Sequence, residues 1–297
     1  MHYSFKIYNE VLEESEKILF VGLLARRTNT SMVNSMSLKL VDGEQKVYFK
    51  AGGEWCYVWT PPGFRVSKPA PVVVHNHGAR GWVKDGSADW IEQPSKNTFL
   101  KAVMENGIVI AGNHACGDHW GNPCAVAANG ALLKILDGCK GLNMSRLGLM
   151  GGGLGGALIW NSVLGPFAGR PKAVAVLQAV ANLAAVVREK KFRAVCLQAY
   201  NIPEDTPDDK AIKLIGNSDP MPKLQSLRMG VKLPRTAIYH GSKDENIPAE
   251  TNAIPLADAL KKAGGEVELN LFKEVEHNVY AMGKPMEDRL RVLFSTL

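Results

Sequence analysis

The residues best suited to chemistry lie around a glycine-rich run at 151–156. An apolar stretch of strand length, 147–150, precedes the run, and an apolar stretch of helical length, 157–164, follows it. A strand, a tight turn and a helix form the setting of the nucleophile elbow G-x-S-x-G. The first and fifth residues of the run fit the two glycines of this motif, but its serine position is occupied by Gly153.

The same run permits two other interpretations. Gly151, Gly153 and Gly156 satisfy the dinucleotide fingerprint G-x-G-x-x-G, and a glycine-rich crossover without chemistry is the third interpretation. A dinucleotide site needs an acidic residue about 20 positions after its glycines, at the end of the next strand. Here the next acidic residue is Glu189, and no Gly-Lys-Ser/Thr follows the run as a phosphate loop requires. The elbow is therefore the favoured interpretation.

Two more residues match what an elbow predicts. In hydrolases with this motif, an acid and then a histidine follow the nucleophile in chain order. Asp244 follows a predicted strand at 236–239, and His277 follows a predicted strand at 267–272. An aspartate that orients a histidine is the base half of a nucleophilic triad. Each residue alone is compatible with a surface loop, but their order predicts that Asp244 and His277 act together.

Two backbone N–H groups are expected to form an oxyanion hole. One donor is the N–H after the nucleophile position, which here belongs to Leu154. The other comes from the loop after an earlier strand, and the sequence His77-Gly-Ala79 predicts the N–H of Ala79. We also expect His77, Arg80 and Trp120 to bind the substrate.

These stretches resemble the α/β-hydrolases of the esterase type, close to prolyl-oligopeptidase-like and dienelactone-hydrolase-like members. The similarity covers roughly residues 55–297 and is carried by His77-Gly78, the glycine run 151–156, the stretch 241–248 and Glu276-His277. The resemblance implies hydrolysis of esters, lactones, thioesters or amides by a serine nucleophile, without a cofactor. The chain departs from it at the residue that attacks.

Glycine at this position leads to three hypotheses. The elbow is a strained turn that glycine accepts without cost, so Gly153 keeps the fold and removes only the hydroxyl. The chain is then a hydrolase inactivated by substitution of its serine, a ligand-binding pseudoenzyme, or a non-hydrolytic or water-using enzyme in which His277 activates a water or a proton. The surviving pair of Asp244 and His277 favours the first hypothesis, an inactivated hydrolase of carboxyl esters, lactones or related acyl compounds.

The order of the predicted elements indicates an α/β-hydrolase fold, with a mostly parallel central sheet flanked by helices. Antiparallel strands are expected at 36–41, 47–51 and 55–60, because Asp-Gly and Gly-Gly pairs separate them. Residues 1–30 are expected to form a helical arm, and 31–297 the hydrolase domain. The polar stretch 180–233 interrupts the alternation of strands and helices and predicts a lid or cap insertion.

Composition excludes several other classes of protein. A chain that is 46% hydrophobic and 22% charged has an ordinary soluble composition, and its net charge of +6 comes from scattered residues instead of a nucleic-acid-binding stripe. No signal region or membrane span is apparent, and the five cysteines, which show no paired spacing, predict reduced thiols and a cytoplasmic location. Cys116, Asp118 and His119 lack the spacing of a metal site. The expected partners are a small acyl substrate and a second copy of the chain, bound through the N-terminal arm, with no nucleic acid and no membrane.

Overall fold

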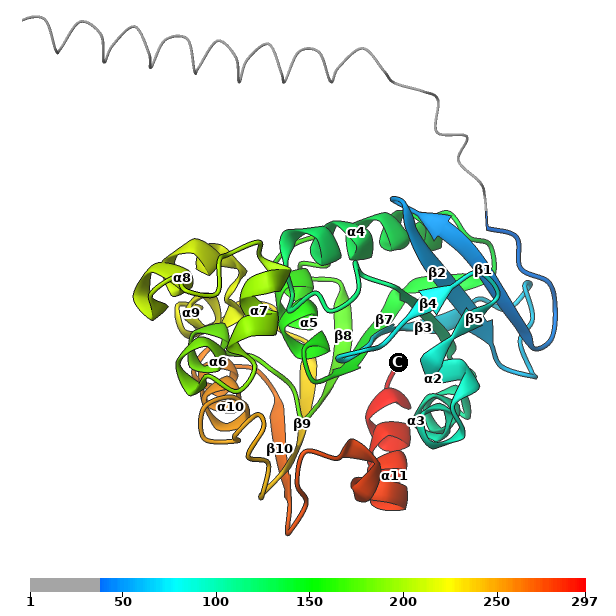
Figure 1. The fold of residues 1–297 in the computed structure, drawn as a ribbon. Coiled ribbons are helices and arrows are strands. Elements are labelled where there is room, and N and C mark those ends of the chain that lie inside the picture. Colours follow the sequence, from blue (N-terminus) through cyan, green and yellow to red (C-terminus); the bar gives the residue numbers. More distant parts are fainter. Residues whose placement is uncertain (1–37) are drawn as a thin grey trace, which may run out of the picture. The chain divides into compact units, whose positions relative to one another are not determined.

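A computed structural model describes residues 38–297 of the chain. Its main feature is one eight-stranded sheet with the order β1-β2-β6-β3-β7-β8-β9-β10 (Figure 1). The strands are β1 (Gln45–Ala51), β2 (Glu54–Thr60), β3 (Ala70–Asn76), β6 (Val109–Asn113), β7 (Leu142–Gly152), β8 (Pro171–Leu177), β9 (Arg235–Gly241) and β10 (Val267–Phe272). β2 runs antiparallel to both of its neighbours, and all other neighbouring strands are parallel. The predicted fold class is therefore confirmed.

Helices cover both faces of this sheet (Figure 1). They are α2 (Asp89–Glu92), α3 (Pro94–Met104), α4 (Pro123–Asp137), α5 (Gly155–Val163), α6 (Leu183–Glu189), α7 (Arg193–Ala199), α8 (Asp208–Ile215), α9 (Pro220–Gln225), α10 (Ala253–Lys262) and α11 (Gly283–Phe294). Shorter elements are the β4–β5 pair (Val83–Lys84, Ser87–Ala88) and the 3-10 turns η1 (Gly216–Ser218) and η2 (Val279–Met282).

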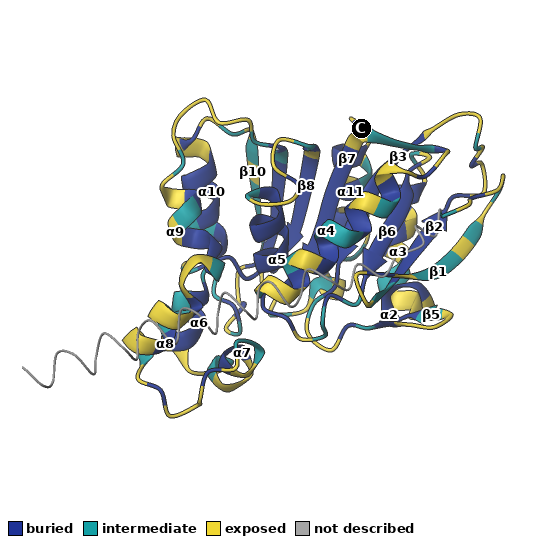
Figure 2. Cartoon of the chain, turned by 90° about the horizontal axis from the view of Figure 1, so that it is seen from above, coloured by how far each residue is buried: buried dark blue, intermediate teal, exposed yellow. Residues whose placement is uncertain are grey.

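Alternation along the strands creates two separate apolar cores. In β3, Val72 and Val74 pack with α4, α5 and α10, whereas Val73 packs with α3 and α11 on the other face. Successive side chains of a strand point to opposite faces, so a strand buried on both sides is apolar throughout. Figure 2 shows the central strands as buried and the exposed residues mainly on the outer faces of the helices.

The prediction of a strand at 36–41 is wrong for residues 38–41, which the structure describes outside any strand. The sheet begins at Gln45. The turn that was expected to form a hairpin docks on a distant loop instead. The N–H of Gly43 donates to the carbonyl of Phe64, and Asp42 accepts from the N–H of Val66. The predicted helical arm, and the self-association expected through it, lie outside the described residues.

The insertion predicted at 180–233 is a group of short helices, α6 to α9, between β8 and β9. The apolar side chains of α6, α7 and α8 form a separate cluster that also includes Leu154 and Trp120, whereas Met221 and Leu224 of α9 belong to the main core. Two hydrogen bonds join α7 and the residue after it to the loop before α4: Asn122 donates to the carbonyl of Ala199, and the Tyr200 hydroxyl donates to the carbonyl of Trp120. The role of these helices as a lid remains a prediction.

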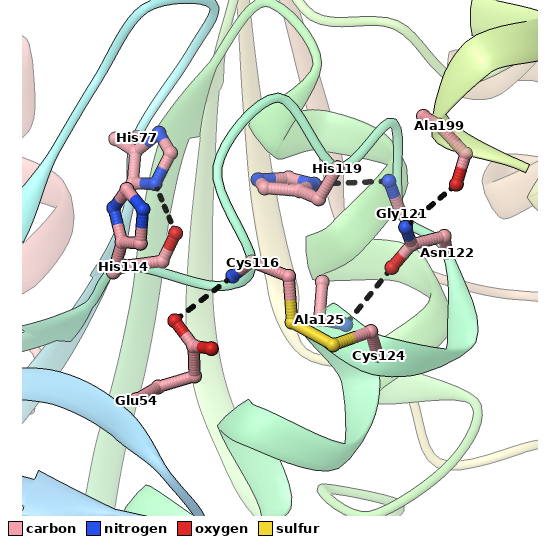
Figure 3. The surroundings of a disulfide bond; sticks show 10 residues. All are labelled: Glu54, His77, His114, Cys116, His119, Gly121, Asn122, Cys124, Ala125 and Ala199. Atoms are coloured by element: carbon pink, nitrogen blue, oxygen red, sulfur yellow. Dashed lines mark hydrogen bonds between the residues drawn. A yellow bond between two sulfur atoms is a disulfide. The ribbon is translucent and has the colours of Figure 1, made fainter.

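Cys116 and Cys124 form a disulfide, so the prediction that all five cysteines are reduced thiols is wrong, whereas the cytoplasmic location remains a prediction. The loop before α4 folds back on the start of that helix and brings the two Cα atoms to 6.3 Å, which is within disulfide range. Figure 3 shows the bridge next to Asn122, whose side chain contacts both α4 and α7. Within residues 38–297, no helix has the length and apolar character needed to cross a membrane.

This disulfide is expected to stabilise the fold. Replacing Cys116 and Cys124 together with alanine should lower the free energy of unfolding by about 2 kcal/mol, because a cross-link over a short loop restricts the unfolded chain. Urea unfolding with and without dithiothreitol provides the measurement. Reductant should destabilise the parent and leave the double variant unchanged; equal midpoints for all four samples would contradict the prediction.

Candidate functional site

Gly153 occupies the turn between β7 and α5, at the carboxyl end of a central strand, where open α/β sheets collect functional groups. Its φ of +52° lies in the left-handed region that glycine adopts freely. The surrounding backbone fixes the turn. The N–H of Gly153 donates to the carbonyl of Leu177, and its carbonyl accepts from Gly156 and Val180.

The glycines of the run have different reasons to be glycine. A Cβ on Gly155 would lie 2.5 Å from the Asn76 carbonyl oxygen, and one on Gly156 would lie 2.4 Å from the Ala179 Cβ. These two positions exclude any side chain, since the neighbouring elements pack directly on their backbone. A Cβ on Gly153 would meet only the Cα of Gly78, at 3.8 Å. There is room for a small side chain at the nucleophile position.

This difference predicts unequal losses of stability. Gly153→Ala should lower the free energy of unfolding by about 1 kcal/mol, the cost of a left-handed backbone for alanine. Gly155→Ala should lower it by about 3 kcal/mol or more, because the added methyl group would meet fixed carbonyl oxygens of β3. Urea unfolding of both variants measures this. A Gly155→Ala loss no larger than that of Gly153→Ala would show that the crowding at the helix start is not rigid.

Asp244 and His277 are joined by a hydrogen bond of 2.8 Å between Asp244 Oδ2 and His277 Nδ1. Asp244 follows β9 and its side chain is fully buried, whereas the His277 side chain is 30% exposed in the loop after β10. The other carboxylate oxygen, Oδ1, accepts from the backbone N–H groups of Asn246 and Ile247. A carboxylate held at both oxygens fixes the orientation of the imidazole.

His240 is a second imidazole on the same carboxylate, and the sequence analysis missed it. Its Nε2 lies 3.3 Å from Asp244 Oδ2 and 2.7 Å from the carbonyl oxygen of Ile247. Both of these atoms only accept, so His240 Nε2 carries a proton. The available signal was its position four residues before Asp244 in the same motif.

Asp244 is held as a carboxylate. Burial by itself would raise its pKa, but hydrogen bonds from His240, His277 and the backbone N–H of Ile247 outweigh that effect and lower the pKa well below the usual value. An ionised carboxylate only accepts hydrogen bonds, so the proton of the neutral His277 ring is on Nδ1. Its Nε2 is then free to accept a proton.

A cavity of about 220 Å³ brings several of these groups together. Gly153, Ala79 and His277 all line it, and Asp244 contacts His277 in the loop beside it. The remaining lining residues are Gly78, Asp89, Trp90, Lys96, Gly152, Leu177, Gln178, Asn278, Val279 and Tyr280. Asp89, Lys96, Gln178 and Tyr280 were missed by the sequence analysis, because only the fold brings their separate segments together.

The loop that carries Ala79 lies beside the ring of His77, and the Gly78 carbonyl in it accepts from the N–H of Gly81. The ring nitrogens of His77 lie 2.8 Å from two carbonyl oxygens, Nδ1 from that of Gly78 and Nε2 from that of His114. The Gly78 carbonyl and the Ala79 N–H belong to one trans peptide unit and point in opposite directions. Holding the carbonyl therefore fixes the direction of the Ala79 N–H. Within residues 38–297, neither this N–H nor that of Leu154 donates a hydrogen bond.

The three residues that were predicted to bind the substrate do not line this cavity. His77 is buried under the Ala79 loop with both ring nitrogens engaged. Arg80 is exposed and its backbone N–H donates to Asp118. Trp120 is buried against Phe192 in the cluster of the helical insertion. We therefore assign none of them a substrate contact.

The arrangement supplies a base and two unused N–H donors but no hydroxyl at the nucleophile position. Such a set can hold a carbonyl group and accept a proton. Among the residues that the structure describes, no group of three or more His, Cys, Asp or Glu side chains could hold a metal ion.

Comparison with known proteins identifies a family for this chain. The prolyl oligopeptidase family matches residues 136–294, and no curated protein matches the sequence. Among solved structures, a prolyl endopeptidase is 14% identical, with a TM-score of 0.63, 85% of this chain covered and 38% of that chain. An acylaminoacyl peptidase from Pyrococcus horikoshii is 15% identical, with a TM-score of 0.59 and coverages of 86% and 41%.

A shorter structure is similar over nearly its whole length. An esterase from the bacterial hormone-sensitive lipase family is 17% identical, with a TM-score of 0.56, 88% of this chain covered and 87% of that chain. The chain thus spans about two fifths of the two peptidases and most of the esterase. At these identities the likeness shows the fold alone.

Proposed function

The chain belongs to the prolyl oligopeptidase family, and on this basis we propose that it is a hydrolase-type protein without its nucleophile. Its site binds the carbonyl group of carboxyl esters, lactones or amides, and Gly153 prevents the formation of an acyl-enzyme. The unmodified chain therefore binds such ligands with little or no turnover.

One observation carries this proposal. Gly153 has the left-handed backbone and the open space of an elbow position, and it lines the same cavity as His277 and Ala79. Neighbouring glycines are required by packing, but Gly153 has no such contact. Its effect on the site is chemical, because a glycine at this position leaves the base without a hydroxyl to deprotonate.

The chemistry that the site lacks can be stated atom by atom. In a serine hydrolase, the hydroxyl gives its proton to the base while its oxygen bonds to the substrate carbonyl carbon. The carbonyl oxygen becomes an oxyanion, here facing the N–H groups of Ala79 and Leu154, and the base then passes the proton to the leaving group. Without the hydroxyl, the carbonyl binds and the first bond does not form.

A second candidate is hydrolysis by water. The observation that favours it is the intact pair of Asp244 and His277, with the imidazole facing a cavity large enough for water. His277 would take a proton from a bound water, which would attack the carbonyl carbon in one step. Slow turnover by the unmodified chain that disappears in His277→Ala, with no acyl-enzyme at any time, would favour this candidate over the first.

Labelling with a fluorophosphonate, which phosphonylates an activated serine, tests the first candidate. The Gly153→Ser variant should gain one phosphonyl group per chain in its intact mass. The unmodified chain and Gly153→Ala should gain none, because neither has a hydroxyl at this position. A folded Gly153→Ser variant that stays unlabelled would overturn the proposal.

A further inference from the structure

The cavity beside Gly153 contains an ion pair that the hydrolytic chemistry does not use. Lys96 of α3 lies with its Nζ 2.7 Å from Oδ2 of Asp89, the first residue of α2. Both residues line the cavity together with Gly153 and His277. The pair is therefore part of the surface that a ligand of this site meets.

The two partners are not equally available to a ligand. The Asp89 side chain is 1% exposed, and its two oxygens accept from Lys96 and from the backbone N–H of Trp82. The Lys96 side chain is 17% exposed, and an ammonium group has three N–H donors, of which Asp89 takes one. Lys96 is therefore the more accessible partner, and it has cationic donors left for a ligand.

Among the residues that the structure describes, Lys96 is the one lysine or arginine that lines this cavity. His75 lies behind the cavity wall, with its ring centroid 4.2 Å from that of Trp90 and the two ring planes tilted by 46°. Burial lowers the pKa of His75 well below its usual value, and the charges of His77 and Lys96 lower it further, so its ring stays neutral. Lys96 is then the charged donor that a ligand meets here, and a ligand that displaces water from it must supply an oxygen acceptor.

Size limits the ligand. The volume of about 220 Å³ lies below the usual range for drug-sized ligands, so the part of a ligand held within the cavity is short. Trp90, Val279 and Leu177 provide an apolar wall between the polar groups. A compound that meets both Ala79 and Lys96 thus has a short apolar spacer with an oxygen at each end.

We propose that Lys96 forms a subsite for a carboxylate, so that the site takes half-esters or half-amides of short dicarboxylic acids. This inference rests on the proposed function, since it assumes that the other end of the ligand is the carbonyl held near Gly153. A neutral carbonyl oxygen could also accept a hydrogen bond from Lys96, but more weakly. The ligands below distinguish it from a carboxylate.

Binding of three N-methyl amides of similar size tests the proposal. N-methylsuccinamate ends in a carboxylate, N-methyl-4-oxopentanamide in a ketone, and N-methylpentanamide has no distal acceptor. The unmodified chain should bind the carboxylate compound at least about tenfold more tightly than the apolar one, as expected for a charged hydrogen bond. Ligand-observed NMR measures the Kd, and amides resist hydrolysis on that timescale.

Variants of the pair separate recognition from folding. Lys96→Met should abolish the preference for the carboxylate, and Lys96→Arg should keep it. Because Lys96→Met leaves Asp89 buried without its partner, the doubly neutral Asp89→Asn/Lys96→Met variant should show the same loss in a stable fold. Asp89→Asn alone should increase the preference severalfold, since it removes a competing carboxylate. Lys101→Met, on an exposed residue of the same helix, is the control.

A merely structural ion pair gives a different set of results. Its variants would change stability but leave the ratio of the three Kd values unaltered, which would overturn the inference. Equal binding of the carboxylate and the ketone would overturn the choice of a carboxylate. Failure of Gly153→Ser to react with the fluorophosphonate, together with a Lys96-dependent preference, would reject the proposed function and retain the subsite. Labelling of Gly153→Ser without a Lys96-dependent preference would reject the subsite and retain the proposed function.

Discussion

Gly153→Ser is expected to release p-nitrophenol from p-nitrophenyl acetate in a burst of about one product per chain, followed by steady turnover. Its rate should exceed that of the unmodified chain by roughly a thousandfold or more, because the members of a triad act as a unit and the loss of one removes most of their joint effect. The left-handed backbone, the open space and the position near His277 are already present. Rapid-mixing kinetics at 400 nm checks both the burst and the turnover.

Two controls isolate the hydroxyl and the base. Gly153→Ala adds the Cβ without the oxygen and should stay as slow as the unmodified chain. Gly153→Ser combined with His277→Ala should lose the burst, since the hydroxyl then has no base within reach. Gly153→Ala as fast as Gly153→Ser would refute a covalent route, and ordinary enzyme rates in the unmodified chain would point to the water-using candidate.

Asp244→Asn, introduced into the Gly153→Ser variant, should lower kcat by about 10⁴-fold. An amide at this position no longer stabilises the imidazolium that forms when His277 takes the proton, and its N–H₂ group favours the wrong tautomer of the ring. The lowered pKa of Asp244 keeps it a carboxylate throughout the assay range. The variant therefore removes a negative charge that is present over the whole assay range.

A neighbouring acid provides the matched control for this prediction. Glu245 is adjacent to Asp244 but exposed, and Glu245→Gln should leave kcat within about twofold because screened surface charges contribute little. His240→Asn should give an intermediate loss, since it removes one of the donors to the same carboxylate. If Asp244→Asn costs no more than Glu245→Gln, the pair does not act as a base.

Most strands of the sheet could be predicted from the sequence, as could the positions of Gly153, Asp244 and His277 after three of them. Gly153 and Asp244 follow strands that are buried on both faces, whereas His277 follows the partly exposed strand β10. The carboxyl ends of parallel strands lie at one edge of a sheet, so residues far apart in the chain are expected at one place without any knowledge of their contacts. The run of glycines at 151–156 also predicted that other groups pack closely on this turn, because a side chain would not fit there.

Only the tertiary structure decided which neighbours complete the site. Lys96 and Asp89 reach the cavity because α2 and α3 pack beside it. A local sequence pattern does not predict this packing. Cys116 and Cys124 pair because a loop folds back on α4, although their spacing gives no signal. His77, which was predicted to contact the substrate, is buried with each ring nitrogen 2.8 Å from a backbone carbonyl oxygen and does not line the cavity. Periodicity and order in a sequence fix which edge of the sheet a residue reaches, whereas side-chain direction depends on contacts between segments that the sequence keeps apart.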